Sequence, residues 1–172
     1  MRTLVLGGSR SGKSTFAEAL LSHEAAVDYV ATAVPDATDR EWADRIAAHQ
    51  DRRPKTWRTI ETGDVALVLV ADGPAVLVES VTTWLARVMD ECHAWSARPE
   101  PRLRERVDEL VEAWELVDRR AVLVSDEVGL GVVPETPAGR LFRDELGSLN
   151  QRLAAAADEV VLIVAGLPLR LR

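Results

Sequence analysis

The first fifteen residues constrain the fold more than any other part of the chain. An apolar run at 2–6 precedes Gly-Gly-Ser-Arg-Ser-Gly-Lys-Ser at 7–14, and an apolar helical pattern begins at Phe16. The run satisfies G-x-x-x-x-G-K-[ST] between a predicted strand and a predicted helix, which is the context that gives the motif its meaning. Its glycines let backbone N–H groups wrap a phosphate chain, and the helix N-terminus adds a favourable dipole. The stretch therefore predicts a loop that binds a nucleoside triphosphate.

Two side chains of this loop have predicted chemical roles. Lys13 can reach the β- and γ-phosphates, and the Ser14 hydroxyl can ligate Mg²⁺. We therefore expect a magnesium-dependent site in which Lys13 is catalytic and Ser14 is a metal ligand.

Composition excludes several other classes of function. A length of 172 residues predicts one domain spanning residues 1–172. A net charge of −7 argues against nucleic acid as a partner, because no general basic field is present to attract its phosphates. Cys92 is the only cysteine, which excludes an internal disulfide, and we expect it to be a small buried apolar group.

Apolar stretches in the sequence are short. None approaches the ~20 residues that a membrane-spanning helix needs. The N-terminal apolar run ends in the phosphate loop, so we do not read it as a signal peptide. Together with the cysteine usage, these features favour a cytoplasmic protein.

Strand-length apolar runs alternate with helical patterns along the chain. Strands are expected at 2–6, 29–33, 56–61, 75–78, 121–125 and 159–164, and helices at 13–24, 38–53, 81–92, 100–118 and 137–157. Several of the strand runs are almost wholly apolar, which is typical of strands buried on both faces of a parallel sheet. The alternation predicts an α/β fold with a mostly parallel sheet flanked by helices. Loops are expected at 93–102 and 126–137, and a short tail at 169–172.

Acidic residues follow two of the predicted strands. Glu79 ends one run, and Asp126 and Glu127 end another. Ligands of open α/β sheets gather at the carboxyl ends of strands, where an acid can hold Mg²⁺ or accept a proton. Acids in this position also serve as helix caps. We expect Glu79 at the nucleotide site as a metal ligand, while the sequence does not choose between Asp126 and Glu127.

His49 has an unusual setting. Trp42, Ile46 and His49 fall on one face of a predicted helix, which places the imidazole on the apolar side, and arginines surround it at Arg45, Arg52 and Arg53. A neutral imidazole there could attack an α-phosphate and form a phosphoramidate. The same spacing fits a packed core histidine, which the residues alone favour.

The other histidines and the tryptophans have simpler interpretations. His23 and His93 are expected at the surface. Trp42, Trp84 and Trp114 lie on helical patterns and are assigned to packing, whereas Trp57 is a candidate to flank the site.

Six motifs together resemble one known family. They are Gly-Gly-Ser-Arg-Ser-Gly-Lys-Ser at 7–14, Tyr-Val-Ala-Thr-Ala at 29–33, Arg-Ile-Ala-Ala-His-Gln-Asp-Arg-Arg-Pro at 45–54, Trp-Arg-Thr-Ile-Glu at 57–61, Glu-Val-Gly-Leu-Gly-Val-Val-Pro-Glu at 127–135 and Asn-Gln-Arg-Leu-Ala-Ala-Ala-Ala-Asp-Glu-Val at 150–160. In this order they resemble the bifunctional adenosylcobinamide kinase/adenosylcobinamide-phosphate guanylyltransferases of cobalamin biosynthesis. The resemblance covers nearly the whole chain except about 88–105.

The resemblance implies a RecA-like P-loop fold, often assembled as a homotrimer, and two successive reactions. ATP or GTP first phosphorylates the aminopropanol hydroxyl of adenosylcobinamide. GTP then loads GMP onto a histidine, and the phosphorylated corrinoid takes the GMP to give adenosylcobinamide-GDP. The guanylylated histidine of the family matches His49, which reverses the interpretation favoured by the residues alone.

The family's nucleotide contacts also match positions in this chain. They are Gly7, Gly8, Ser9, Arg10, Ser11, Gly12, Lys13, Ser14, Ala31, Thr32, Ala33, His49, Gln50, Asp51, Arg52, Glu61 and Glu79. Ser9 stands where alanine is common in the family, and its side chain should not block the backbone cradle.

Two other functions compete with this one. An ordinary small-molecule P-loop kinase would leave His49 structural and form no covalent nucleotide. A regulatory GTPase would need to read guanine, and the chain has no Asn-Lys-x-Asp run for that purpose.

Overall fold

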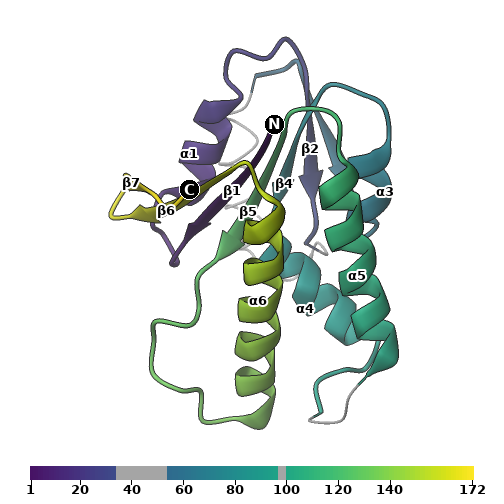
Figure 1. The fold of residues 1–172 in the computed structure, drawn as a ribbon, viewed down its shortest axis with the longest axis vertical. Coiled ribbons are helices and arrows are strands. Elements are labelled where there is room, and N and C mark those ends of the chain that lie inside the picture. The colour runs from purple at the N-terminus through teal and green to yellow at the C-terminus, as the bar shows by residue number, and fades with distance from the viewer. Residues whose placement is uncertain (34–53, 97–99) are drawn as a thin grey trace.

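The computed structural model describes residues 1–33, 54–96 and 100–172, and within them seven strands form one sheet (Figure 1). The strands are β1 Arg2–Gly7, β2 Val27–Ala31, β3 Trp57–Glu61, β4 Ala75–Glu79, β5 Ala121–Asp126, β6 Glu159–Val164 and β7 Leu167–Arg170. Their order across the sheet is β3-β2-β4-β5-β1-β6-β7, and every pair is parallel except β6 with β7. The predicted α/β fold with a mostly parallel sheet is confirmed.

Helices lie on both faces of this sheet. They are α1 Lys13–Leu20, α3 Val65–Val70, α4 Val81–Glu91, α5 Pro101–Leu116 and α6 Pro137–Ala156. Figure 1 shows α1 on one face and α3 to α6 on the other. Because side chains alternate along a strand, Leu4 of β1 packs in the core beneath α3 to α6, while Val5 packs against α1. The central strands are therefore buried on both faces, which explains their nearly continuous apolar sequences. None of the helices in the described ranges is long and apolar enough to cross a membrane.

Most predicted elements are present near their expected bounds. Helix α1 ends at Leu20 rather than at 24, and three further predictions differ from the structure. β2 begins at Val27 rather than at 29, because the charged Asp28 is buried and paired inside the strand. The short helix α3 was not predicted. The expected tail at 169–172 is wrong, because Leu167–Arg170 forms β7, which turns back from Gly166 at φ 80 and pairs with β6. The predicted helix at 38–53 lies outside the described residues.

Predictions for individual apolar residues have mixed outcomes. Trp84 and Trp114 are buried core residues, as expected, and Cys92 is buried beside them. Burial raises the pKa of the Cys92 thiol, which disfavours the reactive thiolate and fits a packing role. The suggestion that Trp57 flanks the site is wrong, because Trp57 aligns with Val27 at the amino end of the sheet and packs in the core.

A buried ion-pair network holds that amino end together. Asp28 is 3% exposed and accepts from Arg58 at 2.9 Å and from Arg119 at 3.0 Å. Arg119, which is 10% exposed, also donates to the carbonyl of Pro74 and so connects β2 to the turn before β4. A carboxylate this well buried is stable only while its partners remain.

Replacing this carboxylate should destabilise the fold strongly. We expect Asp28→Asn to lower the free energy of unfolding by about 3 kcal/mol, because Arg119 would then be a buried cation without its counter-ion. Urea denaturation followed by circular dichroism measures the change. Asp158→Asn is the matched control, since Asp158 pairs with Arg2 at 3.2 Å but is 46% exposed. A loss for Asp28→Asn no larger than that for the control would contradict the structural role.

Candidate nucleotide-binding site

The phosphate loop joins the end of β1 to the start of α1. Two glycines shape it. A Cβ on Gly7 would lie 2.4 Å from Ser11 Oγ and 2.9 Å from the carbonyl oxygen of Ile163, so only glycine fits there. Gly12 caps α1 with φ 95, a conformation that side chains rarely adopt. The loop is further fixed by a 2.8 Å hydrogen bond from Gly166 N to Ser11 O.

The N-terminus of α1 is well suited to bind an anion. No acidic residue lies in its first turn, and no side chain caps it. Gly8, Ser9 and Arg10 are exposed at the loop surface, where their backbone is accessible to a ligand. The helix dipole and the unused N–H groups together favour phosphate at this position.

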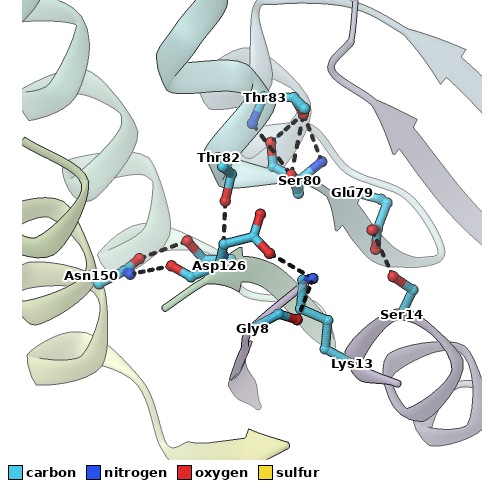
Figure 2. A network of polar contacts seen from close by, with 10 residues as sticks. Gly8, Lys13, Ser14, Glu79, Ser80, Thr82, Thr83, Asp126 and Asn150 are labelled. Carbon is cyan, nitrogen blue, oxygen red and sulfur yellow. Dashed lines mark hydrogen bonds and ion pairs between the residues drawn. The ribbon is translucent and has the colours of Figure 1, made fainter. Parts of the chain in front are cut away.

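Lys13 makes an ion pair with an acid at the end of the neighbouring strand. Its Nζ lies 2.6 Å from Asp126 Oδ1 and donates to the carbonyl of Gly8 at 3.3 Å (Figure 2). β5 runs beside β1 with Asp126 opposite Gly7, so the sheet register itself brings the carboxylate to the loop. The two side chains are 12% and 26% exposed.

The structure thereby distinguishes two acids that the sequence could not. Asp126 faces Lys13, whereas the Glu127 carboxylate accepts a 2.7 Å hydrogen bond from Gly129 N in its own loop. Among the described residues, Asp126 is therefore the acid that the end of β5 brings to the phosphate loop.

Ser14 and Glu79 also meet at this edge. Ser14 Oγ donates to Glu79 Oε1 at 2.8 Å, although the two residues are 65 positions apart (Figure 2). A hydroxyl and a carboxylate are the oxygen donors that Mg²⁺ takes beside nucleotide phosphates. No group of three His, Cys, Asp or Glu side chains in the described ranges could hold a metal alone. The pair therefore fits an ion that phosphate oxygens help to bind.

Other predicted contacts line the same carboxyl edge. Ala31, the last residue of β2, is aligned with Glu61 of β3 on one side and Glu79 of β4 on the other. Ala33 follows Ala31 by two residues and is partly buried. The register therefore brings these predicted residues into one row that continues to the phosphate loop.

Thr32 is fully buried and has a structural task. Its hydroxyl donates to the carbonyl of Ser80 at 2.8 Å, accepts from Ser80 N at 3.0 Å and lies 2.6 Å from Thr83 Oγ1. Ser80 and Thr83 in turn form the capping box of α4 (Figure 2). The network fixes the turn that follows Glu79, while a nucleotide contact by Thr32 stays a prediction.

Sequence reasoning missed two residues that fix the position of Asp126. Thr82 Oγ1 accepts from Asp126 N at 2.8 Å, and Asn150 Nδ2 donates to Asp126 O at 3.0 Å (Figure 2). Asn150 is only 5% exposed, and its Oδ1 accepts from the buried Ser125 hydroxyl at 2.7 Å. A buried asparagine on the apolar face of a predicted helix was the available signal.

Four of the predicted nucleotide contacts lie in a part of the chain that the structure does not describe. His49, Gln50, Asp51 and Arg52 lie outside the described residues, as do the other members of the predicted helix at 38–53. His23 and His93 are exposed, as expected.

Comparisons with known proteins concern the family of the chain. The model of the family described as cobinamide kinase/cobinamide phosphate guanyltransferase matches residues 3–171. The bifunctional adenosylcobalamin biosynthesis protein CobU of Salmonella typhimurium is 39% identical over 183 aligned positions, which cover all of both chains. Protein CobP of Pseudomonas aeruginosa, with the same description, is 40% identical over all of this chain and 98% of its own.

Solved structures support the fold independently. A prototypical ATPase from the type III secretion system of pathogenic bacteria superposes with a TM-score of 0.63 at 12% identity. The alignment covers 94% of this chain, which spans half the length of that ATPase chain. At this identity the likeness concerns the fold.

Proposed function

Because the chain belongs to the cobinamide kinase/cobinamide phosphate guanyltransferase family, and is therefore a bifunctional enzyme, we propose that it carries out both reactions on adenosylcobinamide. In the first, the γ-phosphate of ATP or GTP passes to the aminopropanol hydroxyl. In the second, GMP from GTP passes through His49 to the corrinoid phosphate and gives adenosylcobinamide-GDP. The observation that carries the kinase half is the meeting of Lys13, Ser14, Glu79 and Asp126 around the phosphate loop.

In the kinase reaction, the hydroxyl oxygen attacks the γ-phosphorus while the bond to the β,γ-bridging oxygen breaks, and the hydroxyl proton is released to solvent. The backbone of residues 7–14 holds the phosphates, and the flexible Lys13 follows the charge that moves onto the leaving oxygen. Ser14 and Glu79 would hold Mg²⁺, which supplies positive charge at the β- and γ-oxygens when bound.

In the guanylyl transfer, a ring nitrogen of His49 attacks the α-phosphorus of GTP and pyrophosphate leaves. The resulting P–N bond is then broken by an oxygen of the corrinoid phosphate, which restores the histidine. An imidazole is a competent nucleophile near neutral pH because its ordinary pKa is close to 6.5. The arginines near His49 in the sequence would bind the phosphate oxygens.

Three further features belong to the proposal. Residues 1–172 form one domain, which the family match over 3–171 supports. Three copies assemble as a homotrimer, and the protein acts in the cytoplasm on small-molecule substrates. Size-exclusion chromatography with light scattering tests the trimer.

Label transfer tests the proposal as a whole. With γ-labelled ATP or GTP, adenosylcobinamide should become labelled, and with α-labelled GTP the phosphorylated corrinoid should acquire the label. An enzyme that gives only the first product is a simple kinase, and the guanylyl half of the proposal would then be withdrawn.

Glu79 should be needed for the metal. We expect Glu79→Gln to raise the Mg²⁺ concentration for half-maximal kinase activity about tenfold or more, because an amide oxygen binds the ion less strongly than a carboxylate. Titration of Mg²⁺ at saturating ATP measures this shift. Glu91→Gln, which removes an exposed carboxylate paired with Arg87 on α4, is the control. An unchanged Mg²⁺ requirement for Glu79→Gln would remove Glu79 from the metal site.

A further inference from the structure

We propose that Asp126 is a positioning residue for Lys13, and that its fixed carboxylate makes nucleotide binding depend on Mg²⁺. This inference rests on the proposed nucleotide site but not on the identity of the acceptor. It assigns to Asp126 a charge effect on the lysine rather than a contact with the reacting hydroxyl.

The ion pair is short and shielded on several sides. Lys13 Nζ lies 2.6 Å from Asp126 Oδ1, and the side chains are 12% and 26% exposed. The ammonium also donates to the carbonyl of Gly8 at 3.3 Å, so it lies across the phosphate loop. A pair in this setting is screened by solvent far less than an exposed surface pair.

The backbone of Asp126 is held in place by both neighbouring helices and by the sheet. Its N–H donates to Thr82 of α4 at 2.8 Å, and its C=O accepts from Asn150 of α6 at 3.0 Å (Figure 2). Its Cα is paired with that of Gly7 in the sheet. Lys13, by contrast, has a four-carbon stem with rotatable bonds. When phosphate enters the loop, the long lysine side chain can swing toward it, whereas the carboxylate of the short aspartate side chain remains close to its fixed backbone.

The carboxylate of Asp126 then weakens the binding of a nucleotide that carries no Mg²⁺. The phosphates can reach Lys13 only by breaking its pair with Asp126, and they come to lie beside two acids, Asp126 and Glu79. Like charges in a partly buried site repel one another more strongly than in water. A nucleotide that arrives with Mg²⁺ carries less negative charge and is penalised less. Asp126 therefore selects for the magnesium complex.

Measuring nucleotide affinity with and without the metal tests this role. Asp126→Asn keeps nearly the same shape and removes the charge. In EDTA, we expect the variant to bind GTP on the order of tenfold more tightly than the unaltered protein, because Lys13 is released and a repulsive charge is gone. In excess Mg²⁺ the variant should not show this gain over the unaltered protein. The ratio of the dissociation constant in EDTA to that in Mg²⁺ should therefore be smaller for the variant. Displacement of a fluorescent GTP analogue gives both values.

The adjacent acid provides the matched control. Glu127→Gln removes the same charge one residue away, but its carboxylate contacts Gly129 rather than a lysine. We expect this variant to bind GTP like the unaltered protein in both buffers. Equal gains in the two variants would show a general charge effect and overturn the inference, as would the absence of a gain in Asp126→Asn.

The same measurements distinguish a failure of the proposed nucleotide site from a failure of the role of Asp126. If the unaltered protein binds no GTP in either buffer, the proposed nucleotide site fails. If it binds GTP but Asp126→Asn gains nothing in EDTA, only the role of Asp126 fails. Should Asp126→Asn melt at a lower temperature, Asp126→Ala and Thr82→Ala repeat the test. The first should keep the full gain, and the second, which retains the charge but frees the backbone of Asp126 from α4, should gain less. A gain in Thr82→Ala as large as that in Asp126→Ala would overturn the inference.

Discussion

Lys13→Ala should lower kcat for phosphorylation of adenosylcobinamide by about a hundredfold or more. The ammonium is the flexible cation of the phosphate loop, and it stabilises charge that develops on the leaving oxygen during transfer. Removing an electrostatic contact of this kind slows the chemical step itself, so the loss should appear in kcat. The measurement is steady-state transfer from γ-labelled ATP at saturating substrates, where kcat is separated from KM.

The chain offers a matched control for this variant. Lys55 is the only other lysine, and it is exposed next to the amino end of β3, away from the carboxyl edge that carries the phosphate loop. Lys55→Ala removes an identical side chain and should leave kcat unchanged. Equal activity of Lys13→Ala and the unaltered enzyme, with both folded by circular dichroism, would contradict the assignment of the phosphate loop as the kinase site.

His49→Ala should abolish the covalent attachment of GMP and the formation of adenosylcobinamide-GDP. Alanine has no atom that can attack the α-phosphorus, so the loss should be complete rather than partial. Phosphorylation of adenosylcobinamide should survive at least in part, because direct transfer of the γ-phosphate needs Lys13 and Mg²⁺ but no imidazole. One substitution should thus separate the two half-reactions. Protein-bound label from α-labelled GTP and labelled corrinoid from γ-labelled ATP report them independently.

His23→Ala is the control, since His23 is an exposed histidine that should leave both reactions intact. Two outcomes would count against the role of His49. Retention of GMP by His49→Ala would place the nucleophile elsewhere. A joint loss of both activities with a lower melting temperature would favour the packed core histidine.

The sequence predicted those elements whose conformation depends mainly on their own residues. The apolar runs that open β4 and β5 and the glycines at 7 and 12 each have one physical explanation, and the structure agrees with it. β7 could not be predicted in the same way. Its sequence, Leu-Pro-Leu-Arg, is only four residues long and contains a proline, which disfavours a strand prediction. Its pairing with β6 depends on the turn at Gly166.

The site could be predicted as a set of residues but not as a geometry. Glu79 and Asp126 were candidates because both end strands, yet sequence alone does not state which strands are neighbours. The order β4-β5-β1 brings Asp126 opposite Gly7, and that register decides between Asp126 and Glu127. The hydrogen bond from Asn150 to the carbonyl of Asp126 could not be predicted, because it forms only when α6 packs on the sheet.

The proposed covalent step would distinguish this enzyme from a simple kinase with a phosphate loop, and it can be observed directly. The protein is incubated with GTP labelled at the α-phosphate and Mg²⁺, denatured, and divided between acid and alkali. We predict label on the protein that is lost in acid and stable in alkali, as a phosphoramidate requires, and that moves to added adenosylcobinamide phosphate before denaturation. Active kinase that carries no α-label under these conditions would contradict the two-step guanylyl transfer.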